Sequence, residues 1–291
     1  MSRPALSREL FGRQFQNPLL LASGTAGFGR ELDGVLDLDR LGGLVTKAVS
    51  LHPRLGNPSP RVAEFPGGML NSVGLANPGA HRVRTEYLPW LAGRLNRAQV
   101  LVNVVGFTIE EYAEVVRRLD GIPAIAAFEL NLSCPNTSAG GIEFGADASC
   151  VARIVATCRS RTRLPLIAKL SPVLPDIAGM AVAAQEAGAD GITAVNTLPG
   201  LLFGDNGRAR LGQGNGGISG PALLPAGLLA VTRLRDRLSD VPIIGVGGVR
   251  SAADVKQYLR AGASLVAMGT GVLADPRLPE RIIADLERDG V

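Results

Sequence analysis

The most regular feature of this chain is a series of short apolar runs, each about as long as a β-strand. Eight runs recur: Pro18 to Ala22, Gly43 to Thr46, Val100 to Val105, Ala124 to Leu132, Leu166 to Leu170, Gly191 to Val195, Val241 to Val246, and Leu265 to Met268. Their nearly continuous hydrophobicity is typical of parallel strands that are buried on both faces. Eight strands is the number that a closed parallel barrel requires.

Segments with helical spacing lie between most of these runs. They span Ile109 to Leu119, Ala148 to Arg159, Ile177 to Ala187, Pro221 to Leu238, and Ala252 to Ala261. Strands that alternate with amphipathic helices indicate a parallel sheet covered by helices. The pattern predicts an α/β fold: one (β/α)8 TIM barrel that occupies residues 1–291 as a single domain.

Two connections, Ala48 to Gln99 and Thr197 to Gly220, are too long to be simple turns. Segments that follow barrel strands lie on the C-terminal face, so we expect extended loops on the face that carries the chemistry. The second connection contains a GxGxxG pattern at Gly212, Gly214 and Gly217, but no strand precedes it. We therefore expect a turn-rich loop there and no dinucleotide-binding Rossmann unit.

Composition narrows the classes of partner. The 30 Lys+Arg and 26 Asp+Glu are interspersed and aromatic residues make up only 4% of the chain, so we expect no nucleic-acid binding. The chain shows no signal peptide and no apolar span of about 18 residues, which predicts a cytoplasmic protein without a membrane anchor.

The three cysteines, Cys134, Cys150 and Cys158, have neither CxxC spacing nor a nearby histidine cluster. We expect no metal site, iron-sulfur cluster or disulfide framework within the chain. Cys150 and Cys158 share a predicted helix face and read as small buried hydrophobes.

Candidate chemistry gathers at the ends of the predicted strands. The residues there are Ser23, Lys47, Asn103, Asn131, Lys169, Asn196, Gly247-Gly248 and Gly269-Thr270. A lysine that ends an apolar strand needs an anionic partner to offset desolvation. Glycines that close the seventh and eighth strands are typical of a phosphate site in a barrel. Together these positions indicate a phosphate-bearing, anionic ligand.

The segment Asn131-Leu132-Ser133-Cys134-Pro135-Asn136 adds amides, a hydroxyl and a thiol directly after the fourth run. This position makes Cys134 a candidate reagent.

Five motifs in order make the assignment specific. They are Ala22 to Gly29, Gly56 to Arg61, Gly67 to Gly79, Asn131 to Asn136, and Gly216 to Ala222. Over nearly the whole chain, these motifs resemble the dihydroorotate dehydrogenase family, and within it the catalytic subunit of the NAD-linked class 1B type. The resemblance implies an FMN-dependent oxidoreductase that converts (S)-dihydroorotate to orotate in de novo pyrimidine (UMP) biosynthesis, with Cys134 as the catalytic base.

The resemblance also implies two sets of binding residues. The FMN set is Ser23, Lys47, Ala48, Asn103, Asn131, Lys169, Val195, Gly220, Gly247, Gly248, Gly269 and Thr270. The dihydroorotate set is Lys47, Asn71, Ser72, Val73, Gly74, Leu75, Asn131, Asn196 and Thr197.

The implied reaction moves a proton from C5 of dihydroorotate to Cys134 and a hydride from C6 to N5 of FMN. An unperturbed thiol has a pKa of about 8.5, so activity is expected to rise with pH through the titration of this cysteine. Lys169 would offset negative charge on the reduced flavin, and Lys47 would neutralise the substrate carboxylate.

The class 1B resemblance further implies a partner, because electrons must leave FMN through another protein to reach NAD. That partner is a reductase subunit with FAD and a [2Fe-2S] cluster, in a heterotetramer of two catalytic and two reductase chains. The 1B assignment depends on Gly68 to Asn71, Leu88 to Leu91, and Ser23 to Thr25.

Three alternatives remain open from the sequence: a fumarate-using class 1A homodimer, a flavin-free phosphate-binding isomerase, and a non-catalytic phosphate-binding barrel or scaffold. Two places depart from the family pattern. Pro199 to Arg210 matches no familiar pattern, and Phe107 stands where a small polar residue is expected.

Overall fold

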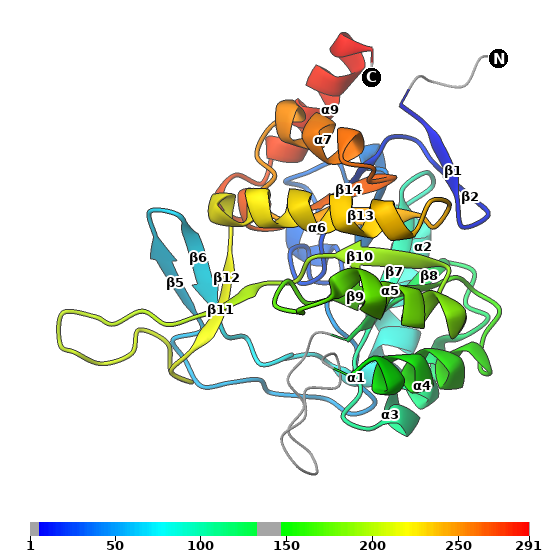
Figure 1. Ribbon diagram of the computed structural model, residues 1–291, viewed down its shortest axis with the longest axis horizontal. Coiled ribbons are helices and arrows are strands. Elements are labelled where there is room, and N and C mark those ends of the chain that lie inside the picture. Colours follow the sequence, from blue (N-terminus) through cyan, green and yellow to red (C-terminus); the bar gives the residue numbers. More distant parts are fainter. Residues whose placement is uncertain (1–5, 133–146, 291) are drawn as a thin grey trace.

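The computed structural model describes residues 6–132 and 147–290. Eight parallel strands close into a barrel in chain order (Figure 1). They are β3 (Leu19–Leu21), β4 (Gly43–Val45), β7 (Gln99–Val104), β8 (Ile125–Asn131), β9 (Leu166–Leu170), β10 (Gly191–Ala194), β13 (Ile243–Val246) and β14 (Leu265–Met268). Each of the eight apolar runs supplies one barrel strand, which confirms the predicted fold class.

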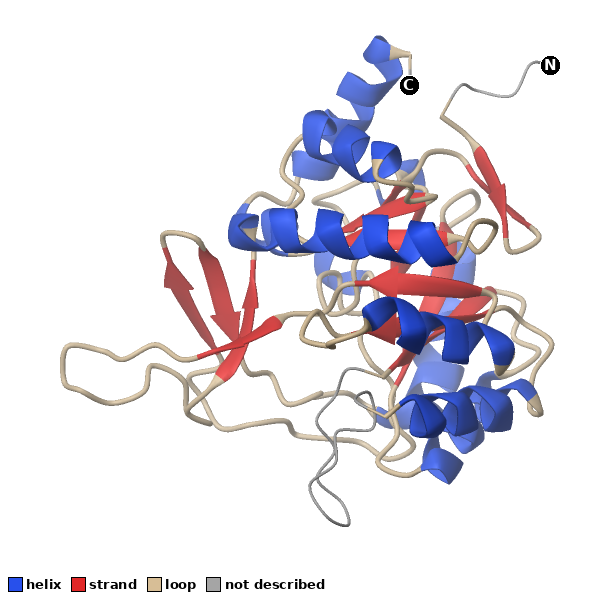
Figure 2. Cartoon of the chain, in the orientation of Figure 1, coloured by secondary structure: helices blue, strands red, loops and turns tan. Residues whose placement is uncertain are grey.

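Helices surround the barrel, as Figure 2 shows. Those that the sequence predicted are α3 (Ile109–Leu119), α4 (Ala148–Arg159), α5 (Ile177–Glu186), α6 (Leu224–Arg237, after the 3-10 turn η5 at Pro221–Leu223) and α7 (Ala252–Arg260). The pattern did not predict η1 (Arg30–Leu32), η2 (Leu38–Arg40), α1 (Gly79–Arg82), the π-helical turn η3 (Val83–Tyr87), α2 (Leu88–Arg94), α8 (Thr270–Ala274) or α9 (Leu278–Asp289). No helix in the described ranges is long and apolar enough to cross a bilayer.

Side chains on the two faces of the barrel form separate apolar clusters. The outward cluster lies between strands and helices, and it includes Leu44, Phe128 and Tyr112. The inward cluster comprises Phe15, Leu20, Ala22, Val45, Leu101, Ala127, Ile167, Ile244, Val246, Leu265 and Ala267. The barrel interior is therefore a packed core, as is usual for this architecture.

An N-terminal hairpin packs against this inner core. Its strands are β1 (Arg8–Leu10) and β2 (Arg13–Phe15), and Phe15 is fully buried. Leu10 and Phe11 pack against the same inner cluster, and the ring of Phe11 lies next to Gly191 at the start of β10. The residues before the first barrel strand thus cover the amino end of the barrel, which leaves the opposite end for chemistry.

A second sheet grows out of the two long connections. Strands β11 (Leu198–Gly200), β12 (Gly216–Ser219), β6 (Gly68–Asn71) and β5 (Val62–Phe65) pair antiparallel in that order. In Figure 1 this sheet projects from the barrel on the side opposite the N-terminal hairpin. The expectation of loops in these connections was incomplete, because the strands have only three or four residues and three of the four contain glycine, so they give no clear periodicity.

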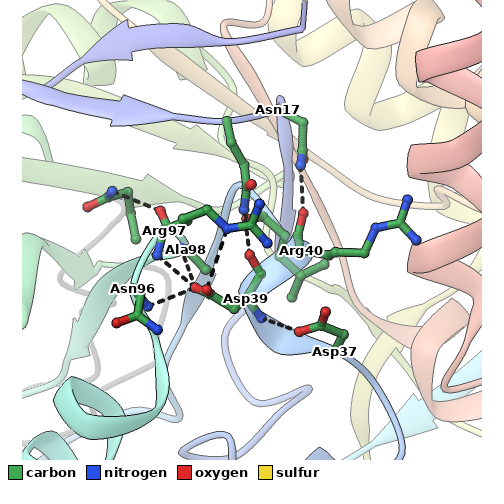
Figure 3. Close-up of polar contacts among 10 residues, drawn as sticks. Asn17, Asp37, Asp39, Arg40, Asn96, Arg97 and Ala98 are labelled. Carbon is green, nitrogen blue, oxygen red and sulfur yellow. Dashed lines mark hydrogen bonds and ion pairs between the residues drawn. The ribbon is translucent and has the colours of Figure 1, made fainter. Parts of the chain in front are cut away.

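Asp39, in η2, organises the amino end of β7. Its Oδ1 accepts hydrogen bonds from the backbone N–H groups of Asn96, Arg97 and Ala98 at 2.9, 2.7 and 3.0 Å (Figure 3). Burial opposes ionisation of this carboxyl, but the three N–H groups and the Arg97 guanidinium together outweigh it and lower its pKa. The carboxylate therefore fixes the entry of the chain into a central strand, at the end of the barrel away from the polar strand ends.

Replacing Asp39 with asparagine is expected to lower the free energy of unfolding by about 1–3 kcal/mol at neutral pH, because charge-assisted hydrogen bonds become neutral ones. The folded-state pKa lies below the unfolded one, so this stabilisation is complete above about pH 4 and is lost as the pH falls through the folded value. Denaturant titrations of parent and D39N at several pH values check this. A difference in stability that persists unchanged in acid would contradict it.

Candidate active site

A polar layer lies directly above the apolar interior of the barrel. On three neighbouring strands the inward residues Leu101, Ala127 and Ile167 are followed, two positions later, by Asn103, Glu129 and Lys169. The layer continues on the next strand with Thr193, and all four side chains are buried.

Glu129 is the centre of this layer. Its Oε1 accepts a hydrogen bond from Asn103 Nδ2 at 2.7 Å and lies 3.5 Å from Lys169 Nζ. Its Oε2 accepts a hydrogen bond from the Thr193 hydroxyl at 2.8 Å. The Glu129 and Lys169 side chains are only 1% and 7% exposed. Sequence reasoning missed Glu129, although an acidic residue within an otherwise apolar strand run was a visible signal.

Two polar groups near this layer have no partner in the part of the chain that the structure describes. Asn103 Oδ1 is buried and accepts no hydrogen bond there. The half-buried Lys47 follows β4 and its backbone N–H donates to Gly27, but no ion pair or hydrogen bond of its ammonium occurs within the described ranges. A buried acceptor and an unneutralised cation are the features that a polar, anionic ligand would satisfy.

The amides predicted to bind substrate are connected to one another. Asn196 Nδ2 donates to Asn131 Oδ1 at 3.4 Å, and Asn196 Oδ1 accepts from the Thr197 N–H at 2.9 Å. Thr197 in turn packs against Gly217, whose carbonyl oxygen accepts from Asn71 Nδ2 at 3.1 Å. The structure thus joins the barrel residues of the substrate set to Asn71 in the second sheet.

The rest of the substrate set, Ser72 to Leu75, follows β6. The Ser72 hydroxyl accepts from Asn57 Nδ2 at 2.8 Å, and the Val73 carbonyl accepts from the Asn57 N–H at 3.1 Å. Gly74 and Leu75 both have positive φ, 72° and 58°. Left-handed backbone at a leucine is uncommon and is typical of a segment that the surrounding structure holds in place.

That segment is anchored at its far side by the buried Asn77. Its Nδ2 donates to the Leu75 carbonyl and to the Ser50 hydroxyl, both at 2.8 Å. Ser50 and Arg54 lie in the connection after β4, and the Arg54 guanidinium stacks 4.2 Å above the Phe107 ring. The unexpected aromatic residue at 107 therefore serves to pack this connection against the loop after β7.

The remaining FMN set occupies the ends of β3, β4, β10, β13 and β14 and the start of η5. Ser23 and Ala48 follow β3 and β4, and Val195 follows β10 after a cis peptide bond with Ala194. Gly247 and Gly248 follow β13, and the Gly247 carbonyl accepts from the buried Tyr258 hydroxyl at 2.8 Å.

Gly269 and Thr270 follow β14, and Gly220 precedes η5. Thr270 Oγ1 donates to Ser219 Oγ at 2.8 Å, which ties the end of the last barrel strand to the second sheet. At Gly220 the chain passes so close to Gly68 that an added Cβ would lie 2.7 Å from its Cα.

Gly248 illustrates how tightly these strand ends are packed. Its φ is +73°, and an added Cβ would lie 2.6 Å from the backbone nitrogen of Leu224, where α6 begins. Gly121 has nearly the same φ, +74°, with nothing within 4 Å of an added Cβ. Alanine substitutions at these two glycines therefore separate two costs to stability: that of a left-handed backbone at alanine, which both share, and that of the contact with Leu224, which only position 248 has.

Alanine at 121 is expected to lower the unfolding free energy by about 1–2 kcal/mol, the cost of a left-handed alanine. Alanine at 248 should cost about 1–3 kcal/mol more, because the start of α6 must also move. Equal losses in the two variants, measured by denaturant unfolding, would show that the contact with Leu224 can relax freely.

Cys134, the predicted catalytic residue, lies outside the described residues, as do the rest of positions 133–146. Of the other cysteines, Cys158 is buried, and burial raises the pKa of its thiol to about 12. Cys150 is half-buried and not fully buried as expected; burial and the nearby Asp147 raise its pKa too. Neither thiol has the low pKa of a reactive cysteine. Within residues 6–132 and 147–290, no group of three or more His, Cys, Asp or Glu side chains could hold a metal ion.

Comparisons with known proteins agree with this arrangement. The family model for dihydroorotate dehydrogenase matches residues 5–289. A Pelobacter propionicus protein named dihydroorotate dehydrogenase B (NAD(+)), catalytic subunit, is 45% identical over 287 residues, which cover 98% of this chain and 93% of the relative. A protein of the same name from Desulforudis audaxviator is 46% identical, with 95% of this chain and 90% of the relative covered.

A solved structure shows the same fold. The crystal structure of a dihydroorotate dehydrogenase from Eimeria tenella, in complex with ferulenol, superposes with a TM-score of 0.80 and 23% identity, covering 97% of this chain and 84% of that one. At that identity the likeness concerns the fold alone. The match over residues 5–289, together with relatives 45% and 46% identical over nearly their full length, shows that this chain belongs to the dihydroorotate dehydrogenase family.

Proposed function

We propose that this chain oxidises (S)-dihydroorotate to orotate in de novo pyrimidine biosynthesis, as the catalytic subunit of a class 1B, NAD-linked dihydroorotate dehydrogenase. The observation that carries the proposal is the identity of 45% to a relative of that name over 98% of this chain. The chain therefore matches that type over its barrel and over both long connections.

FMN is the proposed cofactor, and when bound it would accept the hydride that leaves C6 of the substrate. The residues that would hold it are Ser23, Lys47, Ala48, Asn103, Asn131, Lys169, Val195, Gly220, Gly247, Gly248, Gly269 and Thr270. Two observations support the fit: Asn103 Oδ1 is a buried acceptor without a donor, and no anion neutralises Lys47 within the described residues. The glycines after β13 and β14 would let backbone N–H groups approach the phosphate.

Dihydroorotate would be held by Lys47, Asn71 to Leu75, Asn131, Asn196 and Thr197. Lys47 would pair with the substrate carboxylate, and amides would match the donors and acceptors of the pyrimidine ring. The chain of contacts from Asn131 through Asn196 and Thr197 to Gly217 and Asn71 supports this, because it fixes the amides relative to one another. Cys134 would take the proton from C5.

The electrons would leave through a second protein. We propose a reductase subunit that carries FAD and a [2Fe-2S] cluster, in a cytoplasmic heterotetramer of two catalytic and two reductase chains. The name shared by the relatives, with its catalytic subunit and NAD(+), supports a separate partner. The catalytic chain would form one domain over residues 1–291.

The test compares electron acceptors. The FMN-loaded chain alone should convert dihydroorotate to orotate with an artificial dye, and it should reduce NAD only when the reductase subunit is added. Fumarate reduction by the lone chain would replace the 1B assignment with 1A. Failure to form orotate with any acceptor would overturn the function.

A further inference from the structure

We propose that Glu129 is a positioning residue for the flavin site: its carboxylate orients the Asn103 amide and holds the Lys169 ammonium, so that both side chains are set before FMN binds. The inference rests on the proposed function for the identity of the ligand. Its geometric basis is the buried cluster of four side chains on β7, β8, β9 and β10.

The location of Glu129 requires a reason, because a buried carboxylate costs several kcal/mol unless donors surround it. Residues two positions apart on a strand share a face, so Glu129 lies between Ala127 in the apolar core and Asn131 at the strand end. It is thus the first polar residue of β8 above the core. Three donors from three different strands satisfy it: Asn103 Nδ2, Thr193 Oγ1 and Lys169 Nζ.

The contact with Asn103 decides which end of the amide faces the site. An ionised carboxylate can accept hydrogen bonds but cannot donate them, so the Asn103 atom that lies 2.7 Å from Oε1 must be the amide nitrogen. The carbonyl oxygen is then left as an acceptor, and it is the buried oxygen that has no partner among the described residues. Glu129 therefore presents Asn103 as an acceptor for a ligand N–H group, such as the N3–H of a flavin ring.

The contact with Lys169 has a different consequence. At 3.5 Å and 7% exposure, the ammonium has a fixed counterion inside the barrel wall. The remaining N–H groups of the Lys169 ammonium can face a ligand, and the counterion offsets part of the desolvation cost that an isolated buried charge would carry. Thr193 completes the arrangement, because its hydroxyl binds Oε2 and so keeps the carboxylate from rotating.

Glu129→Gln tests the idea, because glutamine keeps the shape but replaces one carboxylate oxygen with an amide donor. In the parent both carboxylate oxygens accept hydrogen bonds, so the glutamine amide nitrogen must either oppose the donors of Asn103 and Lys169 or face Thr193, whose hydroxyl must then reverse to accept. In both orientations Lys169 loses its counterion. The apoprotein should bind FMN between about tenfold and a hundredfold more weakly, as for the loss of a hydrogen bond to a charged group. Fluorescence titration of apoprotein with FMN measures this without turnover.

A double-mutant cycle asks whether Glu129 acts through Lys169. Lys169→Met alone should also weaken FMN binding. In the E129Q/K169M double variant, the fold-decrease in FMN affinity should be smaller than the product of the fold-decreases in the two single variants. If Glu129 affected FMN binding independently of Lys169, the two losses would multiply. Asp39→Asn is the matched control, since it neutralises a carboxylate at the other end of the barrel and should leave FMN affinity unchanged while lowering stability.

Thr193→Val keeps every charge and removes one donor to Oε2, so it serves if E129Q does not fold. It should weaken FMN binding by about threefold to tenfold, the worth of one hydrogen bond. Unchanged FMN affinity in either folded variant overturns the proposal, as do multiplicative losses in the cycle. If the parent apoprotein itself fails to bind FMN, the proposed function fails and this inference fails with it.

Discussion

Alanine in place of Cys134 is expected to slow the reduction of bound FMN by dihydroorotate by about 10²–10⁴-fold. A positioned acid or base contributes a factor of that size, and alanine has no group that could take the C5 proton. Affinity for FMN should be unchanged, because the proposed cofactor contacts are made by other residues. Anaerobic stopped-flow measurement of flavin bleaching gives the rate directly.

Two further variants sharpen this result. Serine at 134 retains a hydroxyl and should keep part of the rate, with a dependence on pH that no longer follows a thiol. Cys150→Ala removes the half-buried thiol of α4 and should leave the rate unchanged. If C134A reduces its flavin as fast as the parent does, the proton is removed by some other group.

Methionine in place of Lys47 should weaken binding of dihydroorotate and orotate by between about tenfold and a hundredfold, the worth of a charge-assisted hydrogen bond. Methionine keeps the apolar length of the side chain and removes only the ammonium. The reason for choosing Lys47 is that no partner neutralises it within the described residues, in contrast to Lys169 with Glu129. Orotate titration, followed through the flavin absorbance, gives the affinity.

Lys256→Met is the matched control, because Lys256 Nζ pairs with Asp289 at 2.6 Å between α7 and α9, away from the strand ends. That change should leave orotate binding as it is in the parent. Equal affinity in K47M and parent would remove Lys47 from the substrate set.

The barrel could be predicted from the sequence because its strands are buried on both faces. The runs Leu166 to Leu170 and Leu265 to Met268 give strands with those same bounds. The start of α3 is also visible in the sequence, because Thr108 precedes two glutamates and its side chain accepts a hydrogen bond from the Glu111 N–H. The second sheet could not be predicted in the same way. Its strands are short and partly exposed, and three of the four contain glycine. Their pairing depends on contacts between residues far apart in the sequence, such as Asn71 with Gly217.

Some residues of the polar layer could be picked out from the sequence and others could not, for related reasons. Residues at or near the carboxyl ends of the strands, such as Lys47, Asn103 and Lys169, stood out because polar groups interrupt or end apolar runs. Glu129 interrupts one as well, but a single acidic residue gives no hint that Thr193, Asn103 and Lys169 converge on it. That convergence depends on the closure and tilt of the barrel, which bring four successive strands to one point.

The anaerobic addition of (S)-dihydroorotate to the FMN-loaded chain, without its partner, tests the central claim most directly. The visible absorbance of the flavin should bleach with one orotate formed for each flavin reduced. A flavin that stays oxidised in the presence of excess dihydroorotate would contradict the claim that this barrel is a dihydroorotate dehydrogenase.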